Sequence, residues 1–216
     1  MRIIAFTDIH GAYDRIMTIL HQESPADVIL IGGDLTTHGT VEEAEAAVRQ
    51  LQSFGRPLVA VSGNMDHPHF DAAYKRLGVN INAQGAIIDG VGFFGVAGSP
   101  PTPMKTPYEI SEEEIAQRAE AGWADVRFAR RTVFVPHAPP HASRLDRILL
   151  GKHVGSTSVR RFVEAFQPDV LVCGHIHESR GTDSLGRTQM VNCGAASHGH
   201  YAVIDLAEDI TIRLCG

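Results

Sequence analysis

Seven side chains with metal-binding atoms follow short apolar runs of the sequence, close to the point where each run ends. They form an Asp-x-His, a Gly-Asp, a Gly-Asn, a single His and a Gly-His-x-His pattern, which place Asp8, His10, Asp34, Asn64, His137, His175 and His177. Carboxylate, amide oxygen and imidazole together suit first-row transition metals. Helix capping would explain one such aspartate or asparagine, but not seven polar residues in this order. The pattern therefore predicts a metal centre.

Amphipathic segments separate the apolar runs. We expect strands over residues 2–8, 27–31, 57–62, 132–135 and 169–173, and helices over residues 13–20, 41–54, 67–77, 111–126 and 156–166. Strand and helix alternate through the first part of the chain, which is typical of βαβ units and a mainly parallel sheet. Ligands of such sheets gather at the carboxyl ends of the strands, where the candidate ligands stand.

A glycine-rich segment follows within residues 84–97. Asp89-Gly90 divides two short apolar runs there, which predicts a hairpin. Residues 90–95 match G-x-G-x-x-G, but a dinucleotide site needs a helix that begins at the third glycine. This segment continues as a strand instead, so we interpret its glycines as turn and packing residues.

Loops and helix ends are marked by proline, serine and threonine. Four prolines make residues 99–107 an irregular loop, which is a candidate wall of the substrate cleft together with residues 149–155. Thr40 and Ser111 are expected to cap the helices that follow them. The last thirty residues are expected to form antiparallel strands, with a turn at residues 207–209.

The composition describes a globular protein with many histidines. Of its 216 residues, 44% are hydrophobic and 20% are charged, so the chain can bury a core, and its length fits one domain over residues 1–216. The net charge of −6 argues against stable nucleic-acid binding. Three cysteines give no closed disulfide framework, and we read neither a membrane span nor a signal peptide. The expectation is a cytoplasmic protein that does not bind membranes.

The order D-x-H, G-D, G-N, H and G-H-x-H resembles the calcineurin-like metallophosphoesterase superfamily. The motifs read DIH, GGDL, GNMD, PHAPP and GHIHE here, and they extend over nearly the whole chain. The short bacterial and archaeal phosphodiesterases are the most similar form. The resemblance implies an α/β protein, a four-layer α/β/β/α sandwich, with a centre of two divalent metal ions. Manganese is favoured, and iron, nickel and zinc are the alternatives.

Carried over by position, the resemblance divides the ligands into two sets. It implies that one ion is held by Asp8, His10 and His177, that the other is held by Asn64, His137 and His175, and that Asp34 bridges both. Two ions about 3.5–4 Å apart would convert a bridging water into hydroxide, which would attack the phosphorus of a phosphate ester. Asp34 and Asn64 count as catalytic residues on this interpretation.

One position departs from the family pattern. Many relatives have a histidine after Gly-Asn, which is thought to protonate the leaving group or hold the phosphate, whereas this chain has Met65. Either His67 acts in its place as a catalytic residue, or the enzyme favours leaving groups that depart unaided, because a general acid contributes about 10²–10⁴-fold. Asp66, also placed in the catalytic group, is expected to orient His137 or another ligand, with a helix N-cap as the alternative.

These observations predict a metal-dependent phosphoric ester hydrolase, and within that class a phosphodiesterase that acts on a small phosphate ester. Two alternatives stay open. One is a phosphomonoesterase or protein phosphatase, and the other is a catalytically weak or inactive scaffold protein of the same fold. All seven ligand positions carry suitable atoms, which favours the enzyme. Assembly into a homo-oligomer is left open.

Overall fold

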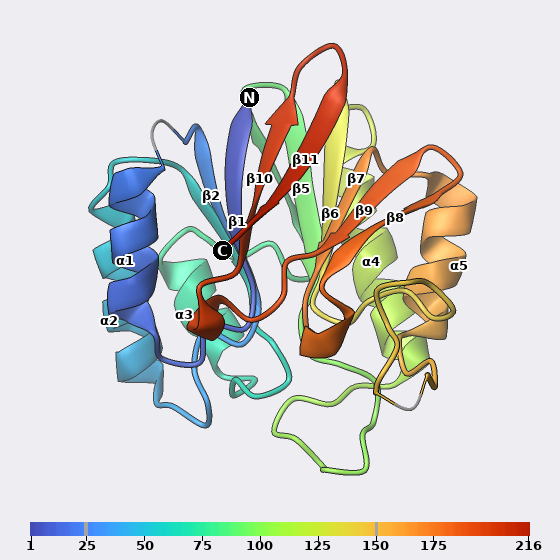
Figure 1. Ribbon diagram of the computed structural model, residues 1–216, viewed down its shortest axis with the longest axis horizontal. Coiled ribbons are helices and arrows are strands. Elements are labelled where there is room, and N and C mark those ends of the chain that lie inside the picture. The colour runs from blue at the N-terminus through green and yellow to red at the C-terminus, as the bar shows by residue number, and fades with distance from the viewer. Residues whose placement is uncertain (24–25, 150) are drawn as a thin grey trace.

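Two β-sheets pack face to face in the centre of the molecule, and helices cover both outer faces (Figure 1). The computed structural model describes residues 1–23, 26–149 and 151–216. The first sheet has the strand order β11-β10-β1-β2-β3, and the second has the order β4-β5-β6-β7-β9-β8. Helices α1, α2 and α3 lie beside the first sheet, and α4 and α5 lie beside the second. The expected four-layer α/β/β/α arrangement is confirmed.

The first sheet is built mainly from the N-terminal part of the chain. Its strands are β1 (Arg2–Phe6), β2 (Val28–Gly32), β3 (Leu58–Val61), β10 (Tyr201–Leu206) and β11 (Ile210–Cys215). The helices on its outer side are α1 (Tyr13–Gln22), α2 (Val41–Gln52) and α3 (Phe70–Arg76). Strands β1, β2 and β3 run parallel, whereas β10 pairs antiparallel with both β1 and β11, as the sequence predicts for the end of the chain.

The second sheet is built from strands between Gly85 and Asn192. Its strands are β4 (Gly85–Ile88), β5 (Val91–Val96), β6 (Arg131–Pro136), β7 (Val170–Cys173), β8 (Gly181–Leu185) and β9 (Thr188–Asn192). Helices α4 (Glu112–Val126) and α5 (Thr157–Phe166) cover it, and two short 3-10 helices follow, η1 (His177–Ser179) and η2 (Ala196–His198). Strands β4 and β5 form the predicted hairpin. The glycine pattern at 90–95 lies in its turn and in β5, so no helix begins there.

Strand β1 is buried on both faces, which explains its continuous apolar sequence. Ile3 and Ala5 point into the core cluster that includes the second sheet, while Ile4 and Phe6 point into the cluster under α1 and α2. Successive side chains of a strand alternate between its two faces. The strand is therefore fixed between two cores, and its carboxyl end is held at a defined place.

Side-chain caps start the helices as the sequence predicts. Thr40 accepts a hydrogen bond from the backbone N–H of Glu43, and Ser111 accepts one from Glu114, each worth about 1 kcal/mol. In a full capping box the Glu43 carboxylate would also accept from the backbone N–H of Thr40. Here that carboxylate accepts from the Tyr13 hydroxyl instead.

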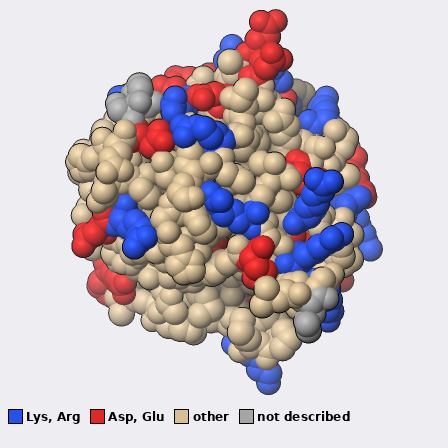
Figure 2. Space-filling view, in the orientation of Figure 1, with Lys and Arg blue, Asp and Glu red and all other residues tan. Residues whose placement is uncertain are grey.

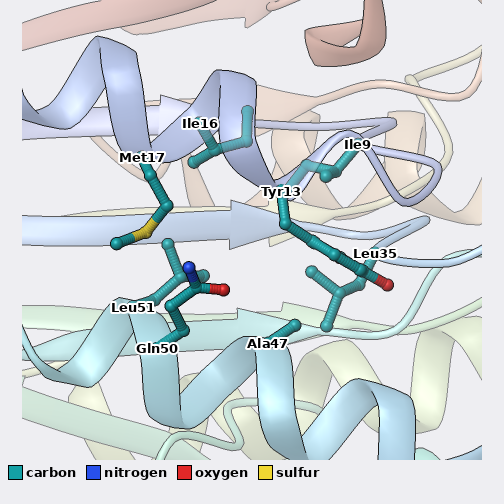
Figure 3. Close-up of a pocket in the computed structure, with 8 residues that line it drawn as sticks. All are labelled: Ile9, Tyr13, Ile16, Met17, Leu35, Ala47, Gln50 and Leu51. Carbon is teal, nitrogen blue, oxygen red and sulfur yellow. The ribbon is translucent and has the colours of Figure 1, made fainter.

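A small cavity lies between α1 and α2, near Tyr13. Figure 3 shows its mainly apolar lining, and its volume is about 10 Å³. That volume is at the lower limit for one water molecule, so the cavity is a packing gap rather than a ligand site. Among the described residues, no helix has the length and apolar character that crossing a bilayer demands.

Candidate metal centre

The carboxyl ends of strands from both sheets meet at one edge of the molecule, at the bottom of Figure 1. All seven predicted ligands follow strands that end there, namely β1, β2 and β3 in the first sheet and β6 and β7 in the second. Backbone hydrogen bonds join the loops, since the N–H of Asp8 donates to Gly33 and the N–H of His10 donates to Asp34. Across the sheets, the backbone N–H of His175 donates to the Asp8 carboxylate at 3.1 Å.

The first predicted set comes together around Asp8. Asp8, His10 and His177 each offer one ligand atom, and these atoms lie within 4.8 Å of one another. His177 Nε2 lies 3.1 Å from Asp8 Oδ1. His10 Nδ1 contacts the Thr37 hydroxyl at 2.8 Å, which leaves Nε2 as the nitrogen that faces the centre. This second contact is of the kind that orients ligating histidines.

The second predicted set converges on the side-chain oxygen of Asn64. His137 Nε2 lies 2.9 Å from this oxygen, and His175 Nδ1 lies 2.7 Å from it. His137 Nδ1 lies 2.9 Å from the carbonyl oxygen of Gly32. A carbonyl oxygen only accepts hydrogen bonds, so Nδ1 carries a hydrogen, and Nε2 is the nitrogen that can hold a metal ion once it has lost its proton.

Asp34 lies between the two sets. Its Oδ2 is 3.8 Å from His10 Nε2 and 3.5 Å from His137 Nε2, while Oδ1 accepts a hydrogen bond from the backbone N–H of Met65 at 2.7 Å. With Asp8 and His137 it forms a second fully buried group of potential ligands. Two donor sets that share one carboxylate fit a pair of divalent cations.

Mutual interactions set the protonation of these side chains. Burial raises the pKa of Asp8, but the hydrogen bond from His177 and the nearby His137 outweigh it and lower the value to about 2. Burial lowers the pKa of His137, yet Asp34 and Asp8 raise it to about 9. Burial and the charge of His137 lower the pKa of His175 to about 4. The metal-free cluster therefore holds a proton on one buried ring where a cation would otherwise balance the carboxylates.

Four of the predicted ligands have a left-handed backbone. The φ angles are +56° at Asp8, +49° at His10, +51° at Asp34 and +65° at His175. Such conformations are uncommon for residues other than glycine and cost of order 1–3 kcal/mol each. Their concentration in three ligand loops indicates that these loops are shaped for the site rather than for local stability.

Two motif glycines are needed because carboxylates lie against them. A Cβ atom at Gly63 would collide with the Asp34 carboxylate, and one at Gly174 would collide with the Asp8 carboxylate. The glycines of the G-N and G-H-x-H motifs thus make room for the acids of the first two motifs.

Asp66 fixes the loops that carry two of the ligands. Its carboxylate accepts from the N–H of Leu35 at 3.1 Å, the N–H of Thr36 at 2.9 Å and the N–H of Gly63 at 2.9 Å. Within the described part of the chain it makes no hydrogen bond to His137, so the expected direct contact with that ring is absent. Helix α3 begins at Phe70 after His69, so Asp66 does not cap it either.

His67 lies at the surface, where its side chain is exposed. Its ring packs against His69 with 4.4 Å between centroids, and its Nδ1 accepts from the His69 N–H at 3.4 Å. It forms no hydrogen bond with any of the seven predicted ligands, as far as the structure describes the chain. Its assignment as a substitute acid stays a prediction.

A groove of about 610 Å³ opens beside His175. Residues 100–104 form one wall and residues 148 and 152–154 form the other, while residues 175, 176 and 178 complete it. Residues 100–104 of the predicted segment 99–107 and residues 152–154 of the predicted segment 149–155 therefore line one groove next to the candidate metal centre. Residue 150 of the second segment lies outside the described residues.

Comparison with family models matches residues 1–179 to the calcineurin-like phosphoesterases. The chain belongs to the calcineurin-like phosphoesterase family. The uncharacterized protein MJ1162 of Methanocaldococcus jannaschii is 32% identical over 216 residues, and the match covers 98% of this chain and 95% of that protein.

Solved structures agree with this calcineurin-like phosphoesterase fold. Protein TT1561 of Thermus thermophilus superposes with a TM-score of 0.76 at 19% identity, over 98% of this chain and 97% of that one. The purple acid phosphatase PPD1 from yellow lupin (Lupinus luteus) gives a TM-score of 0.64 at 11% identity, over 99% of this chain and 51% of that one. Family membership and the Asp/His clusters suggest a phosphoric ester hydrolase that uses divalent metal ions.

Divalent cations are expected to stabilise the metal-stripped calcineurin-like phosphoesterase, and more so as the pH rises. The raised pKa of His137 stabilises the stripped fold below pH 6.5, and this contribution is lost as the pH rises through about 9. A cation must displace that proton, so its affinity grows over the same range. A cation at a concentration of 100 times its Kd adds about 2.7 kcal/mol to the free energy of unfolding, which raises Tm by about 5–10 °C. Thermal unfolding with and without MnCl₂ at two pH values measures this, and an equal gain at both would contradict it.

Proposed function

We propose that the protein is a phosphodiesterase that uses two divalent metal ions, with manganese as the favoured metal. The observation that carries the proposal is the position of Asp34, whose carboxylate lies within 3.8 Å of a ring nitrogen from each donor set. Bound there, two cations would supply Lewis-acid charge to the phosphate oxygens and a nucleophilic water at neutral pH.

The chain's own residues would bind and orient the phosphate group. Only two of the seven ligands, Asp8 and Asp34, are carboxylates, so the ligands balance only half the charge of two divalent ions. The loaded centre is therefore attractive to an anion even though the whole chain has a net charge of −6. The buried Asn64 and His137 present neutral donor atoms that do not cancel this attraction.

Sparse positive charge near the centre favours a diester over a monoester. A phosphate monoester carries a charge of about −1.5 to −2 at pH 7. A phosphate diester has one acidic oxygen and therefore carries a charge of about −1. Among the described residues that line the groove, Lys152 is the one lysine or arginine. Met65 occupies the position where many relatives have a histidine. The site thus offers little beyond the metal ions to hold a second negative charge.

A small ester fits the surface better than a nucleic acid does. On the face shown in Figure 2, Lys and Arg side chains are interspersed with Asp and Glu, so this face has no continuous basic path. Nucleic-acid binding depends on such clustered positive charge. We accordingly propose a small phosphate ester as the substrate.

The test compares two aryl esters on the same protein. The protein is stripped of metal and reloaded with Mn²⁺, and kcat/KM is measured with bis-p-nitrophenyl phosphate and with p-nitrophenyl phosphate. We expect metal-dependent turnover that is faster on the diester. Turnover of the monoester alone would point to a phosphomonoesterase. Absence of turnover, together with metal content near zero by elemental analysis, would favour the scaffold alternative.

A further inference from the structure

An Asp–His pair lies in the wall of the groove, outside the candidate metal centre. His153 lines the groove, and its Nδ1 lies 2.5 Å from Oδ1 of Asp146. The Asp146 side chain is fully buried, whereas 27% of the His153 side chain is exposed. A carboxylate on one ring nitrogen orients the ring and directs the other nitrogen outward, as in many acid–base histidines.

Backbone hydrogen bonds hold the Asp146 carboxylate in its orientation toward this ring. Its Oδ1 also accepts from the N–H of Ser143 at 3.0 Å, and its Oδ2 accepts from Ala142 at 3.1 Å and Gly155 at 3.0 Å. The oxygens of this carboxylate act as acceptors in all these contacts, so Nδ1 of His153 is the donor that carries the hydrogen. The orientation of the ring is therefore fixed by the fold of the loop.

The other ring nitrogen of His153, Nε2, accepts a long hydrogen bond of 3.4 Å from the Nε–H of Arg147. The Arg147 side chain is exposed, so a bound molecule that displaces it would meet Nε2. Among the described residues, the other charged or titratable neighbours of His153 are His141, with 5.9 Å between ring centroids, and the groove residues Lys152, His175 and Glu178.

We propose that His153, oriented by Asp146, is the general acid that protonates the leaving alcohol of the phosphodiester, with that alcohol seated in the groove. The inference rests on the proposed function. As water attacks the phosphorus, the bond from phosphorus to the leaving oxygen breaks, and that oxygen takes the proton from Nε2 of His153. The attacking water releases one proton to solvent, and the neutral ring takes up one proton from solvent, so no further reactant is needed.

His153 fits this role better than the exposed His67 does. The groove that His153 lines also includes His175, whose Nδ1 belongs to the second donor set. His67 does not line this groove and packs on His69 instead. The position that follows Asn64 is filled by Met65, whose side chain has no proton to donate.

Three matched substitutions test the assignment. We compare His153→Gln with His141→Gln and His67→Gln, using methyl phenyl phosphate and methyl 4-nitrophenyl phosphate, which differ only in the leaving phenol. His153→Gln should lower kcat on the phenyl ester by about 10²-fold, yet lower it on the nitrophenyl ester by less than about threefold, because a good leaving group needs no acid. The control variant His141→Gln should match the wild type on both esters, whereas His67→Gln tests the competing assignment of the acid to His67.

Two further readouts separate catalysis from folding. Added imidazole should restore turnover of the phenyl ester by His153→Ala. In NMR spectra, the unreactive analogue methyl benzylphosphonate should shift the ring resonances of His153 and leave those of His141 in place. If His153→Gln loses equal activity on both esters or loses none, or if the His153 resonances do not shift, the role of His153 is overturned while the proposed function stands. A selective loss on the phenyl ester in His67→Gln would assign the acid to His67. A wild type inactive on both esters would overturn the proposed function, and this role with it.

Discussion

Replacing Asp34 with asparagine is expected to lower metal-dependent turnover of bis-p-nitrophenyl phosphate by at least about 10³-fold. The carboxylate lies 3.8 Å from the His10 ring nitrogen and 3.5 Å from that of His137, so it is the group placed to join both cations. Asparagine offers one neutral oxygen and cannot offset the repulsion between two ions. Loss of metal assistance worth several kcal/mol corresponds to this factor. Turnover and bound manganese are measured on the same samples.

Asp89 provides the matched control for this substitution. It is an exposed aspartate in the turn between β4 and β5, and its φ of +48° is close to the +51° of Asp34. Asparagine tolerates the left-handed conformation, so backbone strain is the same in both variants. Asp89→Asn should keep full turnover and metal content. If Asp34→Asn keeps both metal ions and most of its activity, Asp34 is not the bridge.

Asp66→Asn is expected to weaken both the fold and the retention of metal. The carboxylate accepts three backbone N–H groups, and it also accepts the Thr36 hydroxyl at 3.0 Å. An asparagine turns an NH₂ group toward some of these donors, which costs about 1–3 kcal/mol of unfolding free energy. Displaced supporting contacts typically cost about 10–100-fold in metal affinity.

The comparison is made at about pH 8.5, by urea unfolding and Mn²⁺ titration. Burial and the charge of Asp34 raise the pKa of Asp66 to about 7, so the wild-type carboxyl is ionised at that pH. Asp169→Asn is the control, because Asp169 accepts from the Thr132 N–H at 2.9 Å and lies outside the ligand loops. It should lower stability and leave Mn²⁺ affinity unchanged. Equal Mn²⁺ affinity in Asp66→Asn would limit Asp66 to a structural role.

The sequence predicts most of the elements because their signals are local. Buried strands such as β2 appear as short apolar runs, and the caps at Thr40 and Ser111 are visible in a few residues. Strand β8 is not predicted, because its sequence GTDSL is polar and only partly buried. It exists through pairing with β9, which itself lies beside β7. Pairing of this kind depends on residues far away in the chain.

The sequence likewise predicts the candidate site only in part. Motif spacing places the seven potential ligands, and the structure brings them to one edge of the two sheets. The partners of Asp66 could not be predicted, since they depend on how two loops fold over one carboxylate. The sequence also gives no signal for the pair of Asp146 and His153. These residues meet because an irregular loop turns back on itself, and no periodic pattern describes such a loop.

The contact of Asp8 with the backbone of His175 has a consequence for how the protein acquires its metals. These residues are 167 positions apart, and they come from different sheets. Contacts this distant form late in folding, because the chain between them must first become compact. The complete donor set therefore exists only in the finished sandwich. A cation that binds there would stabilise only the fully folded chain. Partly folded chains lack the complete donor set and would gain no stability from the cation.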